Sequence, residues 1–177
     1  MTRTLILSAL TGIVFITLKS CASIPSGVIA VKPFDKDKYL GKWYEIARMD
    51  FRFERNLNKV TAEYSLNENG TVKVDNRGYY FIAMKWKQAT GKAKFAGAMD
   101  VAMLKVSFFG PFYSGYNVIA IDDKYKYALV AGKNLKYLWL LSRETTMPED
   151  IKQSYLNLAK ESGYDVSALL WTVQDKK

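Results

Sequence analysis

The stretch YLGKWYEIAR (Tyr39–Arg48) decides how the sequence is interpreted, because the residue pattern changes there. The chain before it is first strongly apolar and then irregular, whereas the chain after Gly41 alternates between apolar and polar residues, as half-buried strands do. The 177 residues are 49% apolar and 14% aromatic, enough for one domain with a substantial core but hardly for two. We therefore expect a single domain, over residues 39–177, that begins at this stretch.

Residues 1–20 are predicted to be a signal peptide. Leu5–Leu18 is an apolar run of 14 residues, shorter than the roughly 20 residues of a bilayer span. Cys21 follows, the only cysteine of the chain, and its position resembles that of the lipidated cysteine of bacterial lipoproteins. The alternative is a chance cysteine in an ordinary signal peptide, since Lys19 is unusual just before such a cleavage site. By the same resemblance, Ala22 in place of an aspartate implies an outer-membrane anchor.

The part of the chain that remains after export is basic. Loss of residues 1–20 removes Arg3 and Lys19 and no acid, so the 26 basic side chains become 24 against 17 acidic ones. No block of one charge sign occurs, and we expect no nucleic-acid partner. Such a surface favours anionic lipid or envelope polymers, and the alternative is a solvated surface without a partner.

Residues 21–38 lack any sustained period and are predicted to be a tether and an extended lead-in. Eight runs typical of strands follow, several with a period of two and the last three short and strongly β-prone, and NENG (Asn67–Gly70) between two of them is a hairpin signal. The first run begins at Trp43, and the others cover residues 59–66, 71–76, 88–95, 104–108, 115–121, 126–132 and 137–143. Eight antiparallel strands with short turns suit an up-and-down barrel, which leaves no exposed edge. The predicted fold is all-β, an eight-stranded antiparallel barrel with one C-terminal helix.

The helix is predicted directly after the eighth strand. Thr146 and Glu149 have capping-box spacing, Pro148 falls in the first turn, and Gly163 is placed to end the helix. VSALLWTV (Val166–Val173) is expected to form a short ninth strand. The apolar stripe that we expect to pack on the barrel wall is Ile151, Tyr155, Leu158 and Ala159.

This order of elements resembles the lipocalin family. The motifs YLGKWYEIAR, YSLNENG, KVSFFGPFY, GYNVIAID and YLWLLSR resemble more closely the bacterial lipocalins, outer-membrane lipoproteins related to apolipoprotein D, over nearly all of residues 21–175. The resemblance implies that Gly41 allows a tight turn into the barrel, and that Trp43 plugs the closed end with Arg143 across its indole. These three residues are therefore expected to be structural. The second motif of the family is present only as IDDKY (Ile121–Tyr125), which leaves the sixth and seventh strands less sharply placed.

The composition limits the available chemistry. The chain has no histidine and no free thiol if Cys21 is lipidated, which excludes histidine-assisted nucleophiles and histidine-based metal sites. Phosphate-binding glycine loops are missing, and Asp35 and Asp37 have neither the number nor the spacing of calcium ligands. We expect no enzyme, no cofactor and no metal, although carboxylate pairs remain open for acid–base work.

A ligand cavity inside the barrel is the remaining candidate site, because eight strands leave room for one small ligand. Arg143 is expected to point inward over Trp43, and the same phase places Trp139 inward. The predicted ligand-binding residues are Ala62, Tyr64, Val74, Asn76, Ala89, Val106, Phe108, Tyr116, Val118 and Trp139. Asn76, Tyr64 and Tyr116 are the candidates to orient a polar head group, and the alternative for any of the ten is packed core near the closed end.

The segment FFGPFYSG (Phe108–Gly115) is apolar where a polar turn is expected. It is either a hydrophobic lip at the open mouth that touches membrane or ligand, a contact of a homodimer, or a loop folded over the barrel end.

The leading interpretation, which takes its ligands from the family resemblance, is a lipid-anchored protein that stores or transports a fatty acid or lysophospholipid. It would act at the outer membrane, in membrane maintenance or stress, with its barrel in the periplasm. The alternatives are a structural envelope lipoprotein with a plugged barrel and an enzyme on the same scaffold.

Overall fold

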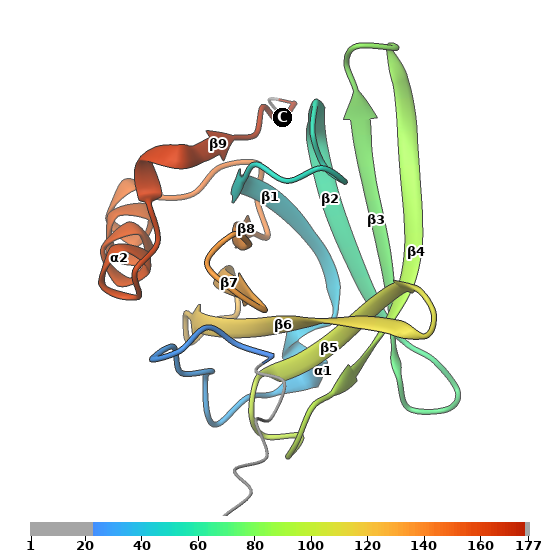
Figure 1. Cartoon of the computed structure of the whole chain (residues 1–177), viewed down its shortest axis with the longest axis vertical. Helices are drawn as coiled ribbons and strands as arrows, with labels where there is room; N and C mark the ends of the chain where they lie inside the picture. The colour runs from blue at the N-terminus through green and yellow to red at the C-terminus, as the bar shows by residue number, and fades with distance from the viewer. Residues whose placement is uncertain (1–22, 176–177) are drawn as a thin grey trace, which may run out of the picture.

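A computed structural model describes residues 23–175 (Figure 1). The predicted signal peptide, Cys21 and Ala22 lie outside the described residues. One antiparallel sheet contains β1 (Gly41–Met49), β2 (Leu57–Leu66), β3 (Val72–Tyr80), β4 (Lys85–Phe95), β5 (Met103–Phe109), β6 (Phe112–Ile121), β7 (Tyr127–Gly132), β8 (Leu138–Ser142) and β9 (Leu169–Trp171). The helical segments are α1 (Lys36–Tyr39), α2 (Glu149–Glu161) and the 3₁₀ turn η1 (Val166–Ala168).

The strand order closes the sheet into a barrel. Strands β2 to β8 pair in sequence, and β1 pairs with β8 on one side and β2 on the other. The register is fixed by pairs such as Trp43 opposite Ala62 and Tyr64 opposite Val74. The last residues of β1 also pair with β9, the predicted ninth strand. The predicted all-β barrel with one C-terminal helix is confirmed.

Helix α2 covers the outside of the barrel, as the red segment in Figure 1 shows. Tyr155 and Ala159 are buried against the wall, and the Tyr155 hydroxyl donates to the Tyr127 carbonyl at 2.9 Å. Gly163 ends the helix with a positive φ of 91°, which suits glycine. The predicted capping box is wrong, because Pro148 occupies the N-cap and makes no side-chain bond there.

The lead-in is bound to the barrel along much of its length. The Val31 amide donates to the Val118 carbonyl and the Ala102 amide donates to the Val31 carbonyl, both at 2.9 Å. Further along, the Phe34 amide donates to the Asp100 carbonyl at 2.9 Å, and the Phe34 side chain is buried. The part of the predicted tether that the structure describes is therefore docked on the strands.

Candidate ligand-binding cavity

The end of the barrel where the chain enters is sealed by Trp43. The indole is fully buried, and the Arg143 guanidinium carbon lies 3.8 Å from its ring centroid, a cation–π contact worth about 0.5–2 kcal/mol. The same guanidinium donates to the Leu40 and Lys42 carbonyls at 2.9 and 2.8 Å. Gly41 has a positive φ of 92°, and a β-carbon there would lie 3.4 Å from the Arg143 guanidinium. The contacts of this trio are therefore structural.

Three tyrosines form the floor of the interior above this seal. The Tyr116 hydroxyl lies 2.7 Å from the hydroxyls of both Tyr39 and Tyr64. Burial raises the pKa of all three phenols above the ordinary value, so all three stay protonated. Two hydrogen bonds use two of the three hydroxyl protons, which leaves one donor for a bound molecule.

A cavity of about 540 Å³ lies between this floor and the open end, within the size range of small-molecule sites. Most of its wall is apolar. Of the ten predicted ligand-binding residues, the structure places nine in the lining: Ala62, Tyr64, Val74, Asn76, Ala89, Val106, Phe108, Tyr116 and Trp139. The Asn76 side-chain oxygen is enclosed and has no hydrogen-bond partner within residues 23–175.

Val118 is the one predicted residue that does not line the cavity. It is fully buried and packs in the same interior cluster as Trp43, opposite Val130 of β7. The period of two gives the face of a strand but not the height along the barrel axis at which the interior fills. Val118 points toward packed core, which was the alternative for each predicted lining residue.

Several lining residues were missed by the sequence analysis. Tyr39 precedes the barrel, and Phe51 and Glu54 lie in the β1–β2 connection, where the period of two does not hold. Tyr137 also lines the cavity, and its signal was present, because it lies two residues before Trp139 and in phase with it.

A buried ionic cluster lies beside the cavity. The Arg48 guanidinium donates to Glu45 at 2.6 Å, and its Nε lies 3.8 Å from the Glu54 carboxylate. Trp139 Nε1 donates to Glu54 at 3.0 Å. Burial, and then the neighbouring Glu45 carboxylate, raise the pKa of Glu54 to about 8. Two carboxylates, those of Glu45 and Glu54, therefore lie close together, a possibility that the sequence analysis did not exclude. The Glu45 carboxylate already accepts hydrogen bonds from Arg48 and Thr172.

The open end of the cavity is basic. Two residues with cationic side chains, Lys87 and Lys133, are part of the lining there. The interior therefore carries hydroxyls at its floor, an apolar wall, and positive charge at its mouth.

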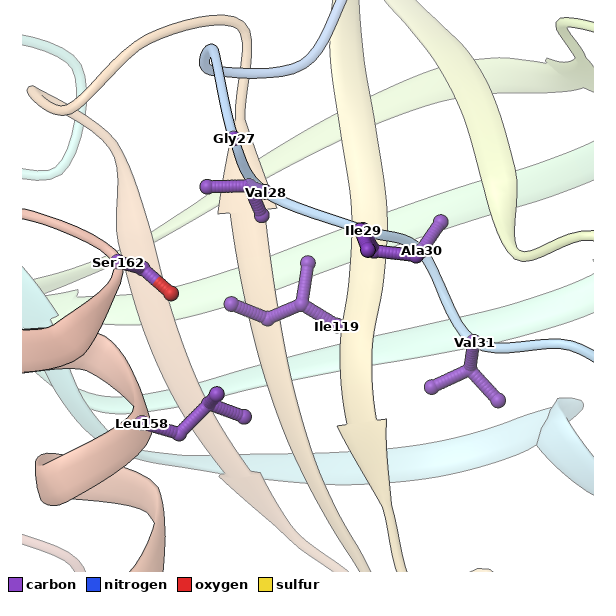
Figure 2. A pocket seen from close by; sticks show the side chains of 8 residues that line it. All are labelled: Gly27, Val28, Ile29, Ala30, Val31, Ile119, Leu158 and Ser162. Carbon is purple, nitrogen blue, oxygen red and sulfur yellow. The ribbon is translucent and has the colours of Figure 1, made fainter.

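A second cavity, of about 340 Å³, lies outside the barrel (Figure 2). Figure 2 shows Leu158 of α2 and Ser162, the residue that follows this helix, facing the lead-in across Ile119. Its only side-chain polar group is the Ser162 hydroxyl, so it offers little to orient a ligand.

The comparisons with known proteins agree with this geometry. A family model described as a lipocalin-like domain matches residues 34–174. The chain belongs to the lipocalin family. The outer membrane lipoprotein Blc of Escherichia coli strain K12 is 50% identical to this lipocalin over 169 residues, 96% of each chain. The Blc protein of Vibrio cholerae is 45% identical and covers 90% of this chain and 94% of its own.

More distant relatives include animal proteins. Apolipoprotein D of Rattus norvegicus is 33% identical, over 84% of this chain and 82% of its own. Among solved structures, insecticyanin from the tobacco hornworm Manduca sexta has a TM-score of 0.70 at 19% identity and covers 86% of this lipocalin and 87% of its own chain. That likeness concerns the fold alone.

The names of the bacterial relatives support an outer-membrane, lipid-anchored location for this lipocalin. Within residues 23–175, no helix is long and apolar enough to cross a membrane. The same part of the chain contains no group of three or more acidic, cysteine or histidine side chains that could hold a metal ion.

Proposed function

We propose that this lipocalin is a lipid-anchored carrier that stores or transports one fatty acid or lysophospholipid at the outer membrane, with its barrel in the periplasm, in membrane maintenance or stress. The observation that carries the proposal is the cavity of about 540 Å³, sealed at one end by Trp43 and open at the other. A structural lipoprotein would not need such a space, because side chains could fill it.

The distribution of polar groups suggests how the ligand lies. The acyl chain runs along the apolar wall, and its burial contributes about 0.8 kcal/mol per methylene. An anionic head group lies near Lys87 and Lys133 at the mouth. The Asn76 amide, which is part of the lining, contacts a ligand hydroxyl, which a lysophospholipid has and a fatty acid lacks.

A chain-length series tests the carrier function. We expect affinity for fatty acids and lysophospholipids to rise with chain length until the cavity is full and then to level off. Quenching of tryptophan emission by the bound lipid measures this affinity. Ala62→Trp fills the cavity without removing a polar group and should abolish binding. Ser65→Trp, on the same strand but exposed and outside the lining, should bind as the wild type does.

Affinity that ignores chain length, or that survives Ala62→Trp, would place the ligand outside the barrel. The lipids recovered after incubation should be chemically unchanged. If the wild type hydrolysed the lipid and Glu54→Gln did not, the result would instead support the enzyme alternative, with Glu45 and Glu54 as the carboxylate pair.

Lipidation of Cys21 is part of the same proposal. Cys21→Ser should abolish incorporation of a radiolabelled fatty acid and release the protein from membranes. Equal labelling of the variant and the wild type would mean that the anchor is elsewhere.

A further inference from the structure

Exposed apolar side chains gather at the open end of the barrel. Eight large apolar side chains within residues 23–175 are more than 60% exposed, and five of these lie at this end. We call these five the mouth ring: Phe53, Ile82, Met84, Phe109 and Phe112. They come from the β1–β2, β3–β4 and β5–β6 connections and the strand residues beside them, which share one end of an antiparallel barrel. Figure 1 shows the β3–β4 hairpin projecting furthest from it.

The charge around the mouth ring is positive. Residues 50–56, 81–87, 109–113 and 132–137 contain six basic side chains and two acidic ones. Both acids already face arginines, Asp50 facing Arg55 and Glu54 facing Arg48. Apolar side chains interleaved with exposed lysine and arginine suit the interface of an anionic bilayer, where rings and aliphatic chains enter the acyl boundary and cations meet lipid phosphates.

The start of the described N-terminal segment is held on β6, the strand that begins with Phe112 of the mouth ring. The Ser23 carbonyl accepts a hydrogen bond from the buried Asn117 amide at 2.8 Å. Gly115 makes this approach possible, because a β-carbon there would lie 1.7 Å from the Ser23 oxygen. The start of the described chain is therefore seated on β6, and Gly115 is only three residues from Phe112.

This seat limits how far the membrane anchor lies from the mouth ring. Cys21 precedes Ser23 by two residues, at most about 7 Å of chain, and three residues of strand span about 10 Å. An acyl group on Cys21 therefore holds the β5–β6 hairpin within roughly 17 Å of the bilayer surface.

We propose that the mouth ring is a membrane-docking surface for an anionic bilayer, and that the seated N-terminal segment turns it toward that bilayer. The cavity then opens onto lipid, so a single-chain lipid can pass between membrane and barrel without crossing water. The inference rests on the proposed lipidation of Cys21 but not on the identity of the ligand.

Site-specific fluorescence tests the docking. The lipidated protein is reconstituted into vesicles of phosphatidylethanolamine and phosphatidylglycerol, with Met84→Cys labelled by an environment-sensitive dye. Asn69→Cys, on the opposite end, is the matched control. We expect a blue shift and quenching by spin-labelled lipids at position 84 only, and both should weaken in high salt or in phosphatidylcholine vesicles. A second label on Cys21, seen by mass spectrometry, would show that lipidation rather than docking has failed.

Equal signals at positions 84 and 69 would overturn the proposal. A blue shift at position 84 that needs no lipid and grows with protein concentration would also overturn it, in favour of a second copy at the mouth.

The double variant Ile82→Ser/Met84→Ser separates docking from binding, because neither side chain lines the cavity. With the dye moved to Ala83→Cys, which is exposed and outside the cavity lining, the double variant should lose the blue shift and keep its affinity for fatty acid. Ala62→Trp should do the reverse. A double variant that stays docked would contradict the membrane surface and leave the carrier function standing.

Discussion

The closed end and the mouth of this barrel handle apolar side chains in opposite ways. At the closed end Trp43 is fully buried, and Arg143 on top of it donates to carbonyls of the entering chain. At the mouth, phenylalanine, isoleucine and methionine side chains are more than 60% exposed. Residues 32–40, 66–71, 95–102, 122–126 and 143–148, at the closed end, contain seven acidic and six basic side chains, against two and six at the mouth. The comparison teaches that one end buries its aromatic side chain for stability, whereas the other leaves apolar side chains exposed, which in our proposal contact the bilayer.

Trp43→Ala should have the largest effect on this contrast, because it opens the sealed end. We expect a loss of roughly 3–5 kcal/mol in the free energy of unfolding, as for other large-to-small changes in packed interiors. Arg143→Ala should cost less, and the two losses should not add, because the guanidinium lies on the indole. Urea unfolding of the two single variants and the double variant measures the coupling. Simple additivity would mean that the closed end is not held by this pair.

Glu54, in the β1–β2 connection on the mouth side of the barrel, should make the free energy of unfolding depend on pH. Its pKa is about 8 in the folded protein, against about 4.3 when unfolded. Between these values the folded state binds the extra proton, so the free energy of unfolding falls as pH rises, by up to about 1.4 kcal/mol per pH unit. Below about pH 4 Glu54 is protonated in both states, so it adds no pH dependence to the free energy of unfolding. Above about pH 8 it is ionised in both states, so the free energy of unfolding falls no further on its account.

Glu54→Gln keeps the acceptor for Trp139 but removes the charge, so it should flatten this part of the profile and be more stable than wild type at pH 8. Urea unfolding at several pH values between 5 and 9 gives the comparison. Parallel profiles for the two proteins would show that Glu54 ionises freely in the folded state.

Gly115→Ala should have an intermediate effect, because it pushes the lead-in off the wall between the two ends. A β-carbon at position 115 overlaps the Ser23 carbonyl, and relieving such a clash costs about 1–3 kcal/mol. The displaced segment should also be cleaved faster by protease. Gly97→Ala is the control, since its β-carbon would meet nothing within 4 Å. Equal cleavage of both variants would argue against a seated tether.

The sequence predicted most of the closed end and the wall, for physical reasons. Alternation with a period of two fixes which face a residue takes, and nine of ten predicted lining residues lie in the cavity accordingly. It carries no information on height along the axis, which is why Val118 was misplaced. It is also silent on connections, so Phe51 and Glu54 were missed. The capping box failed because Pro148, and not Thr146, occupies the N-cap of the helix.

The mouth ring should give the smallest change in stability. Ile82 and Met84 are 63% and 78% exposed, so replacing both by serine removes little buried apolar area. Exposed substitutions of this kind usually change the free energy of unfolding by less than about 0.5 kcal/mol each. Membrane docking should nevertheless be lost, because it depends on the same exposed surface. Urea unfolding and vesicle binding should therefore both be measured for Ile82→Ser/Met84→Ser. The double variant should lose docking and keep its stability, whereas Trp43→Ala should lose stability far more than docking. A large loss of stability in the double variant would mean that the β3–β4 hairpin is part of the packed barrel, and the contrast between the two ends would disappear.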